Sequence, residues 1–141
     1  MPITHKYTLI CDEVRQENNG KFIVIGLYTN DMVVPQIPFV LPSLTFFVFV
    51  DSDRPGNYPF KLKFEQLESG KSLAEGMGMV QFQKPGIASY PIRLGNVQLA
   101  NAGTYTFSLS IEDMKGPIIV AFNVIIGVVG PQPQQQQLSG M

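Results

Sequence analysis

The sequence predicts an all-β protein, an antiparallel β-sandwich of about eight strands. Apolar and polar residues alternate through 103–112 and again through 58–67, which is the two-residue period of strands with one face in a core. Turn residues recur between the apolar runs. No stretch shows the 3.6-residue period of an amphipathic helix, so helical folds are not favoured.

The expected strands follow one another along the chain and lie near residues 6–13, 21–29, 44–50, 58–67, 72–83, 88–99, 103–112 and 117–127. Asn19 and Gly20 form the strongest short hairpin signal, so the first two strands should pair antiparallel. The turn at 113–116 should join the last two strands in the same way. Three prolines in 33–43 predict an extended crossing, and 51–57 reads as a polar loop.

Some strands are apolar at nearly every position, namely 21–29, 44–50 and 117–127. Such runs indicate central strands, or strands whose second face is also covered. Gly76 and Gly78 interrupt another strand, which indicates a bulge or a close approach of the backbone to a neighbour.

Length and composition fit one soluble domain. The chain has 141 residues, of which 45% are hydrophobic and 15% are charged, against roughly 25% charged in an average domain. We expect one domain over 1–128 and a disordered tail rich in Pro and Gln over 129–141. With a net charge of −1 and no basic block, neither nucleic acid nor an anionic membrane is an expected partner.

The N-terminal segment lacks a basic stretch followed by a long apolar one, so no secretory signal is predicted. The longest apolar run, 118–130, is shorter than the roughly 20 residues of a membrane-spanning helix. We therefore expect a cytoplasmic protein.

"LANAGTYTF" resembles the corner that precedes a late strand in immunoglobulin-like domains, where a tyrosine hydroxyl caps backbone of the preceding loop. Tyr105 would be that tyrosine, with Phe107 in the place of the usual cysteine. A wider set of residues resembles a family of small bacterial β-sandwich proteins of unknown function: Cys11, Asp12, Arg15, Glu17, Asn19, Gly20, Lys21, Ile25, Gly26, Pro35, Pro38, Pro42, Gly103, Tyr105 and Phe107. This resemblance implies an immunoglobulin-like fold and a bacterial origin, and it implies no activity.

The single cysteine and the single histidine do not form a predicted catalytic pair. Their spacing puts Cys11 and His5 on the same face of the first strand, but roughly 20 Å apart along it. Hydrogen-bond reach is about 3 Å. Cys11 also shares its parity with Tyr7 and Leu9, so we interpret it as a small core residue and expect no catalytic residues and no enzyme.

Two groups of oxygen-bearing side chains are candidate binding sites. Near the first hairpin, Asp12 is interpreted as structural, a carboxylate that accepts amides of the turn, and Asn19 and Gly20 as the turn itself. In the other group, Asp51, Asp53 and Asn57 give the only weak candidate metal site, for calcium. Ordinary turn chemistry is the favoured reading of that loop, so no cofactor and no metal is predicted.

The predicted function is a non-enzymatic protein-interaction or assembly module, which binds a protein partner or a second copy of itself. The low charge and the strands that are apolar on both faces lead to this prediction. The candidate interface residues are Phe22, Val24, Tyr28, Phe47 and Phe49. The sequence leaves open whether loops or another chain cover that face. The alternative is a ligand-binding sandwich that uses the 51–57 loop, with or without calcium.

Overall fold

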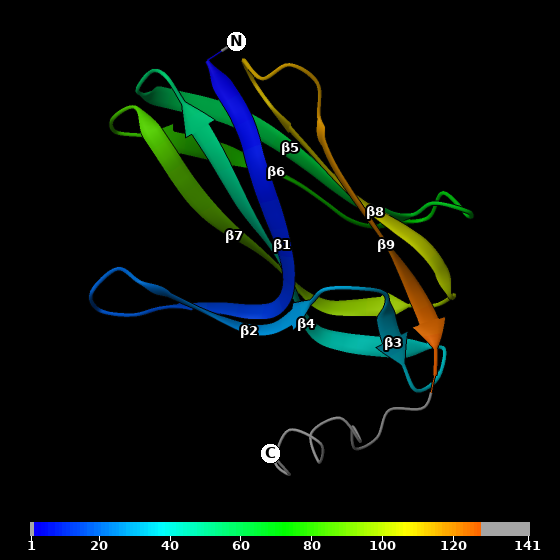
Figure 1. Ribbon diagram of the computed structural model, residues 1–141. Coiled ribbons are helices and arrows are strands. Elements are labelled where there is room, and N and C mark those ends of the chain that lie inside the picture. The colour runs from blue at the N-terminus through cyan, green and yellow to red at the C-terminus, as the bar shows by residue number, and fades with distance from the viewer. Residues whose placement is uncertain (1, 128–141) are drawn as a thin grey trace.

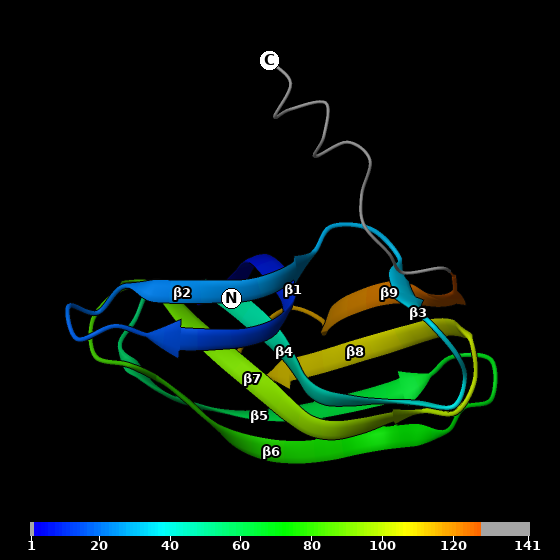
Figure 2. The same cartoon turned by 90° about the horizontal axis from the view of Figure 1, so that it is seen from below.

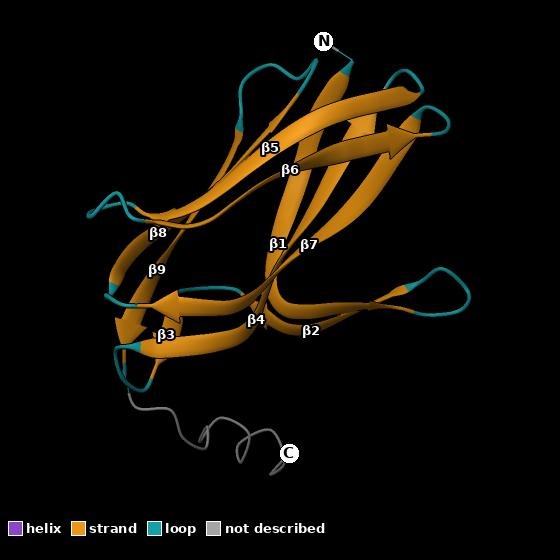
Figure 3. Cartoon of the chain, turned by 180° about the vertical axis from the view of Figure 1, so that it is seen from behind, coloured by secondary structure: helices purple, strands orange, loops and turns teal. Residues whose placement is uncertain are grey.

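The computed structural model describes residues 2–127, and the regular structure in this range is β-strand throughout (Figure 1, Figure 3). The strands in this range are β1 (Ile3–Gln16), β2 (Phe22–Tyr28), β3 (Met32–Val34), β4 (Phe39–Ser52), β5 (Gly56–Gln66), β6 (Ser72–Phe82), β7 (Gly86–Leu99), β8 (Gly103–Ile111) and β9 (Ile118–Ile126). The described part of the chain contains no helix long and apolar enough to cross a membrane. The tail predicted for 129–141 lies outside the described residues.

The strands form two packed sheets, so the all-β sandwich prediction is confirmed (Figure 2). One sheet has the order β2-β1-β4-β7 and the other has the order β3-β9-β8-β5-β6. Neighbouring strands pair antiparallel, except that β3 runs parallel to β9. β3 is the one described strand that the sequence did not predict. It has three residues inside the proline-rich crossing, too few for a hydrophobic period to show.

The core between the sheets contains the alternating residues that the sequence predicted. Tyr105, Phe107, Leu109 and Ile111 of β8 are all buried. From the opposite sheet, the Phe46 ring stacks on the Phe107 ring with 4.1 Å between centroids. The two-residue period of β8 therefore identified its buried face correctly.

The two connections around β4 are shorter than predicted. β4 begins at Phe39 and includes Pro42. β1 pairs with β4 only as far as Thr45, so the segment around Pro42 pairs with β7 alone and its other edge is free of strand pairing. Proline is tolerated on such an edge, where its missing N–H breaks no ladder. At the other end, the Ser52 hydroxyl donates to the Arg54 carbonyl, and this closes the loop to residues 53–55.

The sheet that contains β1 bends sharply along one line, and the bend separates its upper half from its lower half (Figure 1). Gly26 of β2 has a φ of +69° and Asn96 of β7 has a φ of +51°. Pairing is interrupted at the same level in β4, at Pro42, and in β1, at Asp12. Beyond the bend, β1 and β2 continue as a two-stranded hairpin that projects from the sandwich (Figure 3).

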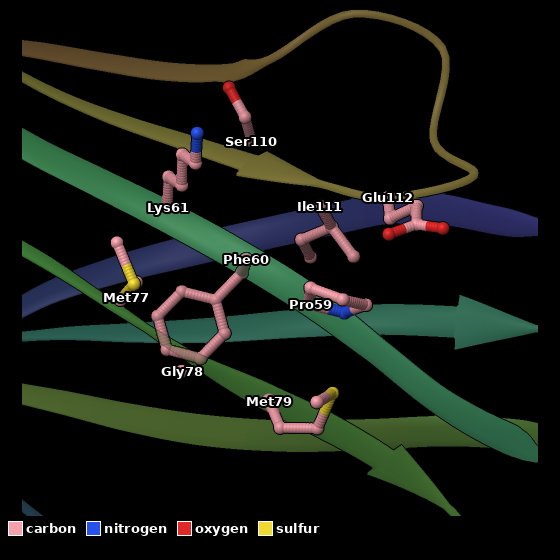
Figure 4. A pocket seen from close by; sticks show the side chains of 9 residues that line it. All are labelled: Pro59, Phe60, Lys61, Met77, Gly78, Met79, Ser110, Ile111 and Glu112. Carbon is pink, nitrogen blue, oxygen red and sulfur yellow. The ribbon is translucent and has the colours of Figure 1, made fainter.

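Glycines in β6 allow side chains of β5 to lie directly over the backbone. A Cβ on Gly78 would lie 2.8 Å from the Phe60 ring, and one on Gly76 would lie 3.6 Å from Leu62. Figure 4 shows Phe60 next to Gly78 on the neighbouring strand. Of the two predicted explanations, close approach is correct for Gly78, whereas a Cβ on Gly76 would make only an ordinary contact with Leu62. The bulge between β5 and β6 lies instead at Phe64 and Glu65.

The predicted tyrosine corner is present. The Tyr105 hydroxyl donates to the Asn101 carbonyl at 2.6 Å, four residues upstream in the loop before β8. This hydrogen bond ties the loop to the start of the strand. The wider likeness to immunoglobulin-like domains stays a prediction.

Candidate interaction surface

Asp12 joins three strands at the base of the projecting hairpin. The Tyr28 hydroxyl donates to its Oδ1 at 2.7 Å, while the Ser43 and Thr45 hydroxyls donate to its backbone carbonyl at 2.7 and 3.2 Å. A Cβ on Gly26 would lie 2.1 Å from Oδ2 of the same carboxylate. Burial, and then this carboxylate, raise the pKa of Tyr28 well above its usual value.

The hairpin turn does not use Asp12, which corrects the role predicted for that carboxylate. The Asn19 side chain accepts from the Lys21 amide at 3.0 Å, the Gly20 amide donates to the Glu17 carbonyl at 3.0 Å, and Gly20 has a φ of +86°. Asn19 and Gly20 therefore form the turn as predicted. Asp12 is structural too, but it secures the bend of the sheet.

We call residues 13–25 the arm. Its cross-strand pairs are Glu13 with Ile25, Val14 with Val24, Arg15 with Ile23 and Gln16 with Phe22. Paired residues share a face, so the arm has one face with Phe22 and Val24 and another with Ile23 and Ile25. An isolated two-stranded hairpin is marginally stable in water, so the arm needs cover on at least one face.

The first face of the arm contacts the protein's own sheet, although Phe22 on that face stays 37% exposed. The Phe22 ring meets the Phe47 ring edge-on with 5.0 Å between centroids. Phe47 in turn lies 4.6 Å from Phe49, and Phe49 stacks on Tyr7 at 4.4 Å. This aromatic row lies on the side of β4 that faces away from the core, and Phe47 is only 2% exposed. The second apolar face of β4 is therefore largely covered from within the chain.

The second face of the arm is bare. Ile23 and Ile25 are 44% and 39% exposed, and Leu27 just beyond the bend is 48% exposed. Their neighbours on β1 are the Glu13–Arg15 pair, whose charged atoms lie 3.5 Å apart and form a polar border. β2 is also an edge strand, and its sequence FIVIGLY contains no charged residue and no proline. Natural edge strands usually carry one of these protections against pairing with another chain.

The predicted interface residues therefore divide into two groups. Phe22, Phe47 and Phe49 meet in the aromatic row, and Val24 shares the arm face with Phe22. Tyr28 does not join them, because it packs against the core and is bonded to Asp12. Sequence reasoning missed Tyr7, Ile23 and Ile25. The signal was available, since β2 is apolar on both faces, but the sequence could not say which face meets its own sheet.

Cys11 and His5 lie on opposite faces of β1, which corrects the prediction that they share one. The register of β1 and β4 shifts at Lys6, so that His5 pairs with Val50 and Cys11 with Thr45. Cys11 is fully buried, but on the side away from the core. Burial, and then the charge of Asp12, raise the pKa of its thiol. Burial lowers the pKa of His5, whose Nε2 is 2.9 Å from the Thr8 hydroxyl.

The three candidate calcium ligands lie in β4, in the loop after it and in β5. Asp51 lies in β4, 4.0 Å from Lys6, and Asp53 is 3.5 Å from Arg54. Asn57 lies in β5 and is exposed. Over residues 2–127, no three His, Cys, Asp or Glu side chains gather closely enough to hold a metal ion.

Comparison with known proteins places the chain in a family. The model of a family of unknown function, DUF6941, matches residues 6–118. The chain belongs to this family. The match agrees with the resemblance drawn from the sequence, while the bacterial origin stays a prediction. No curated protein matches the chain.

Solved structures with a similar fold have very different sequences. The C-terminal domain of Wzt has a TM-score of 0.51 and 10% identity, over 90% of this chain and 75% of that one. A β-glucosidase from Listeria innocua in complex with glucose gives a TM-score of 0.46 at 10% identity, over 67% of this chain and 14% of its own. The β-glucosidase EmGH1 from Erythrobacter marinus gives 0.48 at 8%, over 87% and 15%. The chain thus spans a small part of these glucosidases, and the Wzt domain supports the fold alone.

Proposed function

We propose that the protein is a non-enzymatic assembly module, in which the bare face and free edge of the arm pair with the arm of a second copy. The observation that carries this proposal is an uncharged apolar edge strand whose outward side chains are close to half exposed. Two copies of such an edge can pair antiparallel about a two-fold axis, because the same residues then meet each other.

The size of the exposed face indicates a reversible dimer. Full burial of an Ile or Leu side chain contributes about 1.5–3 kcal/mol, so burying the exposed part of each arm residue contributes about 1 kcal/mol. Four such side chains, Ile23 and Ile25 from each of two copies, contribute about 4 kcal/mol. Association costs about 4–15 kcal/mol in lost freedom, so the backbone hydrogen bonds of the joined edges must supply the remainder. We therefore expect association that depends on concentration.

The surroundings of Cys11 support a role without catalysis. A nucleophilic cysteine needs a lowered thiol pKa and access to substrate. Cys11 is buried, its thiol pKa is raised, and its Sγ donates to the Thr45 carbonyl over a long distance of 3.8 Å.

Sedimentation equilibrium over a hundredfold range of protein concentration tests the proposal. The wild type should shift from monomer to dimer, and the double variant Ile23→Thr/Ile25→Thr should stay monomeric. Threonine keeps the β-branch, so the strand itself should persist. The matched control is Ile87→Thr/Ile119→Thr, at isoleucines that are 65% and 63% exposed elsewhere. A monomeric wild type at every concentration, or equal loss in both variants, would refute the proposal.

A further inference from the structure

A second site lies at the foot of the bend, beside β3, and is independent of the bare face of the arm. A cavity of about 550 Å³ opens there, a volume within the range of small-molecule pockets. Its wall is mostly apolar, with Met32 and Val34 at the buried side and Phe39 and Leu41 from β4. The polar residues in the wall are Asp12, Tyr28 and Ser43.

The Asp12 carboxylate has no cation beside it. None of the ion pairs among the described residues includes Asp12, and no lysine or arginine lines the cavity. The nearest cation in the hydrogen-bond network is Arg93, and its Nε donates to the Ser43 hydroxyl at 2.9 Å. A half-buried carboxylate in an apolar wall gains from a charged donor, because hydrogen bonds between ionised groups are stronger than neutral ones.

The hydrogen-bonding capacity at this point is also incomplete. Oδ1 of Asp12 accepts from the Tyr28 hydroxyl, and Oδ2 packs against Gly26 on one side. The second lone pair of Oδ1, the outer side of Oδ2 and the lone pairs of the Tyr28 oxygen remain as acceptors. An ammonium group carries three donors and one positive charge, which matches these acceptors. A neutral hydroxyl would match them in geometry but not in charge.

We propose that this cavity, which we call the bend pocket, binds a small organic amine whose protonated nitrogen pairs with Asp12 and whose apolar body lies against Met32, Val34 and Phe39. The volume and the apolar wall select the body of the ligand, and the unpaired carboxylate selects its charge. Tyr28 positions the carboxylate through its hydroxyl.

Isothermal titration calorimetry of the full chain with 2-phenylethylamine tests the site, with 2-phenylethanol as the neutral counterpart. We expect the amine to bind at least about tenfold more tightly, which is the lower end of a charge-assisted hydrogen bond. Asp12→Asn keeps an acceptor for Tyr28 but removes the charge, and it should remove this preference. Asp51→Asn removes a carboxylate outside the pocket and should leave the preference unchanged.

A second measurement uses only the wild-type protein, so it does not require any variant to fold. In methyl NMR spectra of the wild type, the amine should shift the signals of Met32 and Val34 and leave those of Met77 and Met79 in place. The two control methionines line a different groove, on β6 (Figure 4). Equal binding of amine and alcohol would overturn the proposal, as would shifts at Met77 alone or no binding of the amine at 10 mM. None of these outcomes bears on dimer formation, so the two proposals fail separately.

Discussion

Replacing Gly26 with alanine should destabilise the protein through two separate effects. The first is conformational, because a φ of +69° costs a residue with a Cβ about 1–2 kcal/mol. The second is steric, because the new Cβ would lie 2.1 Å from Oδ2 and 2.6 Å from Cγ of Asp12. The carboxylate must then turn away and lose the Tyr28 hydroxyl.

A matched control separates the conformational and the steric contributions to the loss of unfolding free energy. A hydrogen bond to a charged group contributes about 1.5–3 kcal/mol, and partial exposure of this one lowers the figure to about 1–2 kcal/mol. Gly26→Ala should therefore cost about 2–4 kcal/mol of unfolding free energy in total. Gly70 has the same φ of +69° and open space around it, so Gly70→Ala should cost only the conformational part.

Urea unfolding followed by circular dichroism measures both free energies. Most of the steric part should disappear when Asp12 is shortened to Ala, because only the contact with the Cβ of residue 12, at 3.1 Å, remains. Gly26→Ala should therefore cost less in an Asp12→Ala background than in the wild type. If Gly26→Ala and Gly70→Ala are equally destabilising in the otherwise unchanged protein, the contact between Asp12 and Gly26 does not hold the bend.

Three further predictions follow from buried hydroxyl and thiol groups. Tyr105→Phe should lower the unfolding free energy by about 1 kcal/mol in urea, because the Asn101 carbonyl loses its donor, and an unchanged midpoint would contradict this. Cys11 should not react with a thiol reagent until the protein is unfolded, and rapid labelling of the native protein would contradict its burial. The raised pKa of Tyr28 means that above its ordinary value of about 10 the unfolded chain loses a proton that the folded chain keeps. Stability should therefore fall as the pH rises above about 10. In urea titrations this fall should be smaller for Tyr28→Phe, and equal falls would refute the shift.

Local patterns were sufficient to predict most of the fold. The alternation in β8 identified its buried residues, Asn19 and Gly20 identified the first turn, and the sequence around Tyr105 identified the corner. Each of these features depends on residues close together in the chain. A single sequence therefore contains the information that specifies them.

The bend and the arm depend on contacts between distant residues, so the sequence could not predict them. The bend needs the Ser43 and Thr45 hydroxyls to reach Asp12 from another strand. The extra residue at Lys6 reverses the face of every residue before it, so parity alone placed His5 wrongly. The same limit applied to β2, where both faces are apolar and only packing shows that Phe22 is the residue that contacts its own sheet.

Intermolecular paramagnetic relaxation enhancement tests most directly whether a second copy covers the bare face of the arm. One preparation carries a spin label at Arg15→Cys in a Cys11→Ala background. The other preparation is the wild type without a spin label, and its methyl groups are isotope-labelled. In the mixture, we expect broadening of the Ile23 and Ile25 methyl signals and none at Ile119. Sharp signals at Ile23 and Ile25, or broadening that is equal at Ile119, would contradict it.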